Sequence, residues 1–324
     1  VDRETTTATA MTFGVNPDLM TWSPFHGALY AVVDSITKLV ALGASAERAR
    51  LTFQEYFEHL GKDAEKWGSP FIALLGALWA QHEMGVPAIG GKDSMSGTFE
   101  HIHVPPTLAS FAVAMKADRA VSPEFKYAGS KVYLVPAPKD DEDLPNFKAL
   151  CRGFREIHAM AEAKKVFAMQ SVGVGGIAAA ITKMALGNGI GFRFKNPMAV
   201  GELFTPDYGA ILMEVAADTD TALLCKTGAY ELGETTEAGS IVCGGAEVPL
   251  KELLEAYTEP LERIFPTKAP QKSREERAVS VSYEKGCSIR RATAVPRPRV
   301  FIPVFPGTNC EYDSERAWLR AGAD

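Results

Sequence analysis

The segment from Val86 to Thr98, VPAIGGKDSMSGT, joins an apolar approach to a glycine-rich polar stretch. Paired glycines, here Gly90 and Gly91, let a backbone turn sharply and approach a ligand without a Cβ in the way. The polar side chains that follow are Lys92, Asp93, Ser94 and Ser96. Free N–H groups, an ammonium and hydroxyls suit a phosphate, and a carboxylate suits a cation or a lysine. The pattern predicts either a phosphate-binding loop, though not a Walker A loop, or a solvated polar turn after a buried strand.

Length and composition bound the class of protein. The 324 residues have room for about two domains, and the apolar (46%) and charged (23%) fractions are typical of globular proteins. A formal net charge of −6 argues against a general nucleic-acid binder, which would present a basic face. No apolar run has the length of a membrane span, and no signal-peptide pattern opens the chain. Scattered cysteines without a C-x-x-C pair indicate a reducing compartment, so we expect a cytoplasmic protein.

Both ends of the chain suggest a piece of a longer protein. The run from Val1 to Thr12 is strand-like and polar. Near the other end, the apolar run Arg299–Phe305 precedes a Pro-Gly turn and a helical pattern from Glu311 to Arg320. Strand, glycine turn and helix in this order open an α/β domain, and the chain stops before a second strand. We therefore expect a fragment.

The first region, Val1 to about Ala117, contains two expected helices. Apolar residues recur at helical spacing over Ala28–Leu42, after a loop from Gly14 to Gly27. Within that helix Asp34 and Lys38 lie four residues apart on one face, which is typical of a surface salt bridge. A second helix is expected over Ser69–Gly85, with apolar residues at Phe71, Ile72, Leu74, Leu75, Leu78 and Trp79.

Two strands are expected in the same region. The run Arg50–Phe57 predicts a strand with Gln54 and Glu55 as available polar groups, and His101–Met115 predicts a strand interrupted by two prolines. His101 and His103 alternate to one face, but two histidines without a third ligand are more typical of a surface than of a metal site.

A charged, turn-rich stretch near Lys116–Gly129 suggests a boundary, after which a second region begins. Its expected elements are strands at Lys131–Val135, Tyr208–Val215, Tyr230–Gly233 and Ser240–Cys243, helices at Asn146–Lys165 and Leu250–Ile264, and a charged linker at Lys268–Thr293. Within Val166–Leu186 a short strand leads through Ser171, Gly173, Gly175 and Gly176 into an apolar helix. Unpaired N–H groups at such a helix start suit an anion, and tight strand-to-helix packing explains the same glycines.

Three stretches, GGKDSMSGTF, FQEYFEHLGKD and PRVFIPVFPGTNCEYDSERA, together resemble the phosphoribosylformylglycinamidine synthase family in its large form. The resemblance covers essentially the whole chain. It implies an α+β, aminoimidazole ribonucleotide synthetase-like repeat of two subdomains, the second of two such repeats, followed by the first strand and helix of an α/β class I glutaminase domain. The boundaries that it implies are 1–117 and 118–267 for the subdomains, 268–297 for a linker and 298–324 for the glutaminase start.

The resemblance also implies a reaction. ATP with Mg²⁺ phosphorylates the amide oxygen of formylglycinamide ribonucleotide, and ammonia released from glutamine then displaces the phosphate to give the amidine. Each nucleotide site of such enzymes lies between two repeats, so one repeat supplies half a site. The partners implied are the first synthetase repeat and the glutaminase domain of the same parent chain. We expect the fragment alone to be inactive, and to self-associate through the apolar surface that the first repeat would cover.

Particular residues take family roles from this resemblance. Gly91, Lys92 and Ser94 match positions for ATP, magnesium and substrate, although a lysine would supply positive charge rather than bind magnesium. Asp34 and Lys38 match a glutamate and an asparagine that help to hold the metal of an auxiliary nucleotide.

The loop of that auxiliary site is matched by Met169 through Gly176, with Ser171, Gly173, Gly175 and Gly176 as candidate contacts. Met169 stands where the family has a metal-binding aspartate, and a thioether is a poor magnesium ligand. The resemblance therefore predicts a degenerate auxiliary site, with Asp34 as its one remaining candidate metal ligand.

Other functions remain open from the sequence. Cys310 follows the expected first strand of the glutaminase and is not its nucleophile, so no glutaminase activity is expected. A self-contained, homodimeric ATP-using enzyme of the same fold would need an acidic metal set and a glycine-rich N-terminal segment, which the sequence lacks. A non-catalytic structural repeat with a degenerate nucleotide site is the remaining alternative.

Overall fold

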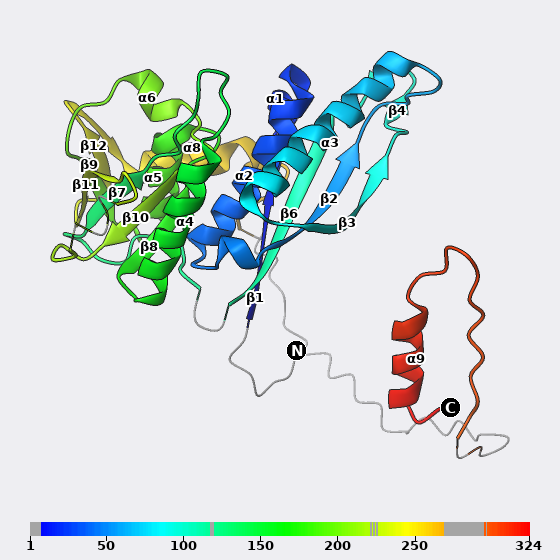
Figure 1. The fold of residues 1–324 in the computed structure, drawn as a ribbon. Coiled ribbons are helices and arrows are strands. Elements are labelled where there is room, and N and C mark those ends of the chain that lie inside the picture. Colours follow the sequence, from blue (N-terminus) through cyan, green and yellow to red (C-terminus); the bar gives the residue numbers. More distant parts are fainter. Residues whose placement is uncertain are drawn as a thin grey trace, which may run out of the picture. The chain divides into compact units, whose positions relative to one another are not determined.

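The computed structural model describes residues 8–116, 120–220, 222, 224, 226–268, 295 and 297–324. The chain divides into two compact units, Val1–Thr267 and Lys268–Asp324. The first unit carries a four-stranded and a seven-stranded sheet with their helices, and Figure 1 shows both sheets. No helix in the described part of the chain is long and apolar enough to cross a membrane.

The four-stranded sheet has the order β1-β6-β2-β3. Its strands are β1 (Ala8–Gly14), β2 (Arg50–Tyr56), β3 (Ala88–Ser94) and β6 (Thr107–Lys116). β6 pairs antiparallel with both β1 and β2, whereas β3 runs parallel to β2 at the edge. Burial alternates along β2, so that Leu51 and Phe53 face the core while Thr52 and Gln54 face the other side. One face of this sheet is therefore covered by helices, and the other is open.

Helices α2 (Pro24–Ala41) and α3 (Ala64–Met84) belong to this sheet. Close approach depends on small residues: a Cβ on Gly14 would lie 2.2 Å from the Ala31 carbonyl oxygen of α2. A Cβ on Gly76 of α3 would lie 2.1 Å from the Phe25 carbonyl oxygen. α3 buries its small residues against α2 and leaves its large apolar side chains exposed, among them Phe71, Ile72, Leu74, Leu75, Leu78 and Trp79.

The seven-stranded sheet has the order β13-β12-β9-β11-β7-β10-β8. Its strands are β7 (Lys131–Val135), β8 (Val166–Ser171), β9 (Gly191–Phe194), β10 (Ile211–Val215), β11 (Tyr230–Thr236), β12 (Ser240–Cys243) and β13 (Ala246–Pro249). The accompanying helices are α4 (Phe147–Glu162), α5 (Gly176–Asn188), α6 (Val200–Phe204) and α8 (Leu250–Glu262). Every residue of β10, the second strand from one edge, is buried, as expected for a strand covered on both faces. α2 also contacts β8, so this one helix packs against both sheets.

Several sequence expectations need correction. The stretch from Gly14 to Gly27 is not a loop, because α1 (Pro17–Trp22) and the start of α2 lie within it. The Asn16 side chain accepts a hydrogen bond from the Leu19 N–H and caps α1. The prediction of a loop from the proline-rich composition overlooked this local signal. The second helix begins at Ala64 rather than Ser69, because Asp63 caps it. The expected linker Lys268–Thr293 lies outside the described residues except for Lys268.

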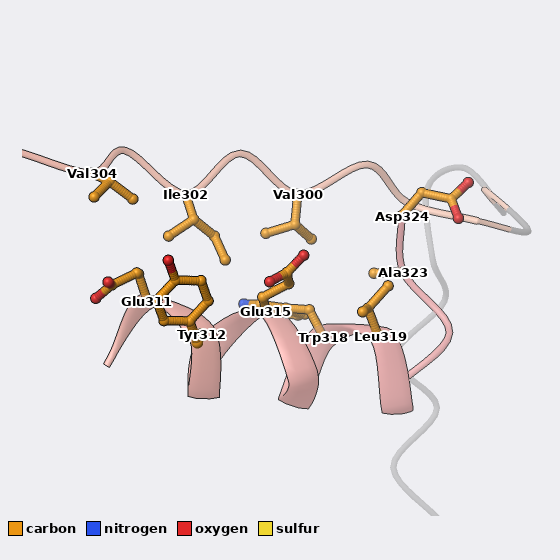
Figure 2. A pocket seen from close by; sticks show the side chains of 10 residues that line it. All are labelled: Val300, Ile302, Val304, Glu311, Tyr312, Glu315, Trp318, Leu319, Ala323 and Asp324. Carbon is orange, nitrogen blue, oxygen red and sulfur yellow. The ribbon is translucent and has the colours of Figure 1, made fainter. Parts of the chain in front are cut away.

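The second unit contains a helix but no described strand. α9 (Glu311–Arg320) has the predicted bounds, whereas Arg299–Phe305 is not a strand, because no neighbouring strand pairs with it in the described part of the chain. Figure 2 shows Val300 and Ile302 facing Tyr312 and Trp318 of α9 across a cavity of about 360 Å³. A hydrogen bond from the Val300 N–H to the Asp324 carbonyl oxygen, 2.8 Å, holds the two segments together.

Candidate functional site

The glycine-lysine-aspartate-serine segment belongs to β3, an edge strand of the four-stranded sheet. This corrects the expectation of a turn at Gly90 and Gly91. β3 continues through both glycines to Ser94, in parallel register with β2. The register shifts between Leu51 and Phe53, and Gly90 has a φ of 153° at this irregularity. The chain turns only after the strand, where the Gly97 N–H donates to the Phe57 carbonyl oxygen at 2.9 Å.

The glycine that β3 requires for packing is Gly91. A Cβ at this position would lie 2.4 Å from the Phe53 carbonyl oxygen, which is closer than real Cβ contacts come. Gly90 has open space where its Cβ would be, so its positive φ rather than crowding favours glycine there. The two glycines thus let β3 approach β2 and keep the ladder through an irregular register, and neither makes a sharp turn.

Strand alternation separates the polar residues that the sequence suggested would converge. Lys92 and Ser94 pair with Gln54 and Tyr56 and point to the open face of the sheet. Asp93 pairs with Glu55 on β2 and points to the opposite face. The ammonium of Lys92 hydrogen-bonds the backbone carbonyl oxygen of Asp93 and not its carboxylate. Ser96 lies beyond the strand and is exposed.

Glu55 is the residue at this edge that sequence reasoning left without a role. It is 6% exposed, and its Oε1 has no hydrogen-bond partner within the part of the chain that the structure describes. Burial and, secondarily, the negative charge of Asp93 raise the pKa of Glu55 to about 7. The signal that could have found it is the period of two in β2, which puts a carboxyl on the same face as Leu51 and Phe53.

The other candidate residues meet in one cavity of the first unit, of about 180 Å³. Its lining includes Asp34, Lys38, Ser171, Gly173 and Gly176 of the sequence prediction. Gln170, within the matched loop, also lines the cavity, and sequence reasoning missed Val15, Lys183 and Tyr208. The structure therefore brings together residues of α2, β8 and the start of α5 that lie more than a hundred positions apart in sequence.

The Asp34 carboxylate in this cavity is neutralised by a lysine of the same helix. The Lys38 ammonium lies 2.7 Å from Asp34 Oδ2 and also donates to the Phe13 carbonyl oxygen at 2.8 Å. The Asp34 side chain is only 7% exposed, so this is not the surface salt bridge that the spacing suggested. Burial raises the pKa of Asp34, and the charge of Lys38 and its hydrogen bond oppose that shift.

Of the predicted glycines Gly175 and Gly176, Gly176 lines the cavity and Gly175 does not. A Cβ on Gly176 would lie 2.5 Å from the Leu203 carbonyl oxygen of α6, so tight packing explains this residue. Gly175 has a φ of 85° and precedes α5 without a side-chain cap. Met169 is buried in β8 opposite Met213 of β10 and does not line the cavity.

The two histidines considered as metal ligands, His101 and His103, do not form a cluster with acidic or thiol side chains in the described part of the chain. His103 lies 3.3 Å from Glu58 and hydrogen-bonds the Thr98 hydroxyl at 3.0 Å. No group of three or more histidine, cysteine, aspartate or glutamate side chains that could hold a metal occurs among the described residues. Among the described residues, a metal site would therefore have at most two such ligands in one place, together with water or a bound ligand.

No protein-family model matches the chain. Phosphoribosylformylglycinamidine synthase subunit PurL of Thermoplasma acidophilum is 21% identical over 259 residues, covering 71% of this chain and 32% of the relative. The subunit of the same name from Helicobacter hepaticus is 23% identical over 300 residues, covering 81% of this chain and 38% of the relative. The chain thus spans about a third of the length of these curated relatives.

Solved structures with a similar fold also include PurL proteins. Thermotoga maritima PurL complexed with FGAR matches with a TM-score of 0.63 and 15% sequence identity, covering 76% of this chain and 46% of that one. The same protein complexed with ATP matches with a TM-score of 0.59 and 16% identity, covering 76% and 44%. The fold is therefore the α+β, aminoimidazole ribonucleotide synthetase-like fold of PurL synthetase domains. In sequence and fold, the chain is similar to PurL.

Proposed function

We propose that this chain is part of a phosphoribosylformylglycinamidine synthase, the ATP-dependent ligase that uses formylglycinamide ribonucleotide and glutamine-derived ammonia. The observation that carries the proposal is the pairing of this fold with polar residues on an uncovered sheet face, Lys92 and Ser94 of β3. Solved PurL structures with FGAR and with ATP support both ligand classes. In the proposed enzyme the reaction needs positive charge and N–H groups at the moving phosphoryl group.

The open face of the four-stranded sheet supports the proposal that this chain supplies half of a site. Large apolar side chains stand on it uncovered: Met11 is 68%, Phe13 55% and Met115 65% exposed. Tyr56, Gln54, Lys92 and Ser94 continue the same face toward the β3 edge. Exposed apolar patches of this kind mark interfaces. In our proposal the first synthetase repeat covers this face and completes the site, the fragment alone is inactive, and in isolation it self-associates there.

The cavity lined by Asp34 and Lys38 corresponds, in this proposal, to a degenerate auxiliary nucleotide site. A magnesium ion needs anionic oxygen ligands, but the Asp34 carboxylate is already engaged by Lys38. The residues present therefore do not fit a metal at Asp34. ADP with Mg²⁺, soaked into crystals of the protein, should not become ordered against Asp34 and Ser171, and ordered nucleotide there would contradict this part of the proposal.

The proposed domain limits are those that the resemblance to the synthase implies. Subdomains at 1–117 and 118–267 correspond to the two sheets, and 298–324 would start a glutaminase domain that docks on the synthetase in the parent protein. A cytoplasmic location fits an enzyme of purine biosynthesis. A non-catalytic structural repeat is the alternative, and the self-neutralised pair of Asp34 and Lys38 favours it for the auxiliary site alone.

Calorimetric titration of the chain with formylglycinamide ribonucleotide and, separately, with MgATP tests the proposal. Substrate binding that is lost in Ser94→Ala is expected, because this hydroxyl lies on the open face. Thr258→Ala, whose hydroxyl bonds only within α8, is the matched control and should bind as the wild type does. Substrate affinity that is unchanged in Ser94→Ala would contradict the proposed half-site, whereas no binding of either ligand would mean that the site forms only when both repeats meet.

A further inference from the structure

Three neighbours of Glu55 in the sheet and along its strand are buried apolar residues. Phe53 precedes it and Phe57 follows it on the same face of the strand, and Leu108 is its cross-strand neighbour on β6. These three side chains are at most 8% exposed and offer no hydrogen bond. A buried carboxyl oxygen without a partner is unfavourable, since it has lost water and gained nothing in exchange. Such an exception calls for a ligand or an ordered water.

The fourth side of Glu55 leads to Asp93. The two residues are direct partners in the parallel ladder of β2 and β3, which run side by side at the edge of the sheet (Figure 1). Side chains of direct partners project from the same face of a sheet and are near neighbours. Asp93 is exposed because β3 is the edge strand, so the pair opens to solvent on this side. Two carboxyl groups in this arrangement repel each other when both are ionised.

The nearby cations do not neutralise the pair. Lys92 points to the other face of β3, and its ammonium is engaged by a backbone carbonyl oxygen. Lys66 is occupied by Glu58, at 2.7 Å. No ion pair joins Glu55 or Asp93 to a lysine, arginine or histidine within the described ranges of the chain. The pair therefore differs from Asp34, whose charge is neutralised by Lys38.

We propose that Glu55 and Asp93 together bind a divalent cation of the Mg²⁺ class at the β2–β3 edge. Two carboxylates from protein, with the remaining positions taken by water, are a usual environment for Mg²⁺. A cation there gives the orphaned Glu55 carboxyl a partner and removes the repulsion with Asp93. Hard oxygen ligands without a thiol or imidazole favour Mg²⁺ or Mn²⁺ over softer metals. A use of this cation in holding phosphate oxygens would rest on the proposed ligase function, whereas its binding does not.

Binding of Mn²⁺ alone, without nucleotide or substrate, tests the cation site. Mn²⁺ takes the same oxygen ligands as Mg²⁺, and the free ion is counted by electron paramagnetic resonance. We expect one Mn²⁺ per chain, displaced by Mg²⁺. Glu55→Gln and Asp93→Asn should each weaken binding by about tenfold or more, since each removes one of two anionic ligands. The matched controls Glu252→Gln and Asp218→Asn, both at exposed positions, should bind as the wild type does.

Three results would overturn the proposal: no Mn²⁺ binding by the wild type at millimolar concentration, binding unchanged in both variants, or binding lost only in Asp34→Asn. Because Asp93 is exposed, its variant tests the site even if Glu55→Gln folds poorly. A rise in melting temperature with Mn²⁺ in the wild type but not in Asp93→Asn gives a second readout. A wild-type protein that binds substrate but no Mn²⁺ would contradict the cation site and leave the proposed function standing.

Discussion

The Asp34 cavity and the β2–β3 edge both contain a buried carboxyl group, and they satisfy it differently. Asp34 has a lysine one helical turn away, and Lys38 closes the pair at 2.7 Å inside a cavity shared with α5. Glu55 has only another carboxylate, Asp93, as its polar neighbour in the ladder. The Asp34 carboxylate therefore has a cationic partner within the chain, and the Glu55 carboxyl has none in the described part of the chain. From residue type alone, the Asp34 cavity would be the stronger candidate for binding a ligand, because its loop of glycines and its acid are more recognisable ligand-binding features.

The largest expected effect comes from breaking the self-contained pair. Lys38→Met leaves Asp34 buried without its cation, and we expect a loss of about 3 kcal/mol in the free energy of unfolding at pH 8. The loss should shrink at low pH, because the raised pKa of Asp34 lets it become neutral. Urea unfolding measures it. Lys183→Met, on an exposed residue of the same cavity, should change stability by less than about 0.5 kcal/mol.

A double variant sharpens that result. Asp34→Asn combined with Lys38→Met removes both charges, so it should recover most of the stability lost in Lys38→Met alone. Equal losses in the single and double variants would mean that Lys38 acts through its aliphatic packing and its bond to the Phe13 carbonyl oxygen, and the contrast between the two sites would then be weaker.

The second effect tests the packing of the β2–β3 edge. Gly91→Ala places a methyl group 2.4 Å from the Phe53 carbonyl oxygen, so β3 must shift, and we expect a loss of about 2 kcal/mol. Gly68→Ala is the matched control, because its Cβ meets nothing within 4 Å and alanine favours the helix by about 0.5–1 kcal/mol. Both are measured by urea unfolding. Equal stability of the two variants would show that β3 is not held tightly against β2.

The third effect concerns the pH dependence of stability in metal-free buffer. Glu55 has a folded-state pKa of about 7 against an ordinary value of 4.5, so it favours the folded state below that ordinary value, and this contribution is lost as pH rises through 7. Glu55→Gln should flatten the curve between pH 5 and 8 relative to the wild type by an amount on the order of 1 kcal/mol. Other raised carboxyl groups, including Asp34 and Glu214, remain in both proteins, so only the difference is diagnostic. Parallel curves would mean that Glu55 does not change protonation in this range.

The smallest effect on stability, but a clear one on association, is expected at the open sheet face that continues from the β3 edge. Met115→Glu places a charge among exposed apolar residues of β1 and β6, and should shift sedimentation from dimer or larger species toward monomer. Tyr257→Glu, at an equally exposed apolar position on α8, is the control and should leave the distribution unchanged. A monomeric wild type at all concentrations would contradict the predicted self-association.

Local patterns predicted much of the fold. The apolar period identified α2, and β7 and α9 have the expected bounds, because spacing and turn residues act within a few positions. Local capping also explains two misses, since Asn16 starts α1 and Asp63 starts α3 earlier than the apolar pattern suggested. The α+β class and the resemblance to PurL followed from the same sequence and agree with the similarity in fold.

The tertiary structure alone decided how the site residues meet. Paired glycines permit a turn or a strand, and only the approach of β2 makes Gly91 part of a ladder, because a Cβ would strike the Phe53 carbonyl oxygen. The spacing of Asp34 and Lys38 gave their contact, but not the burial of Asp34 or the cavity that residues of β8 and α5 also line. The pairing of Glu55 with Asp93 could not be read from residues 38 positions apart, since register depends on the whole sheet. Sequence determines which groups are available, and packing determines which of them lack a partner.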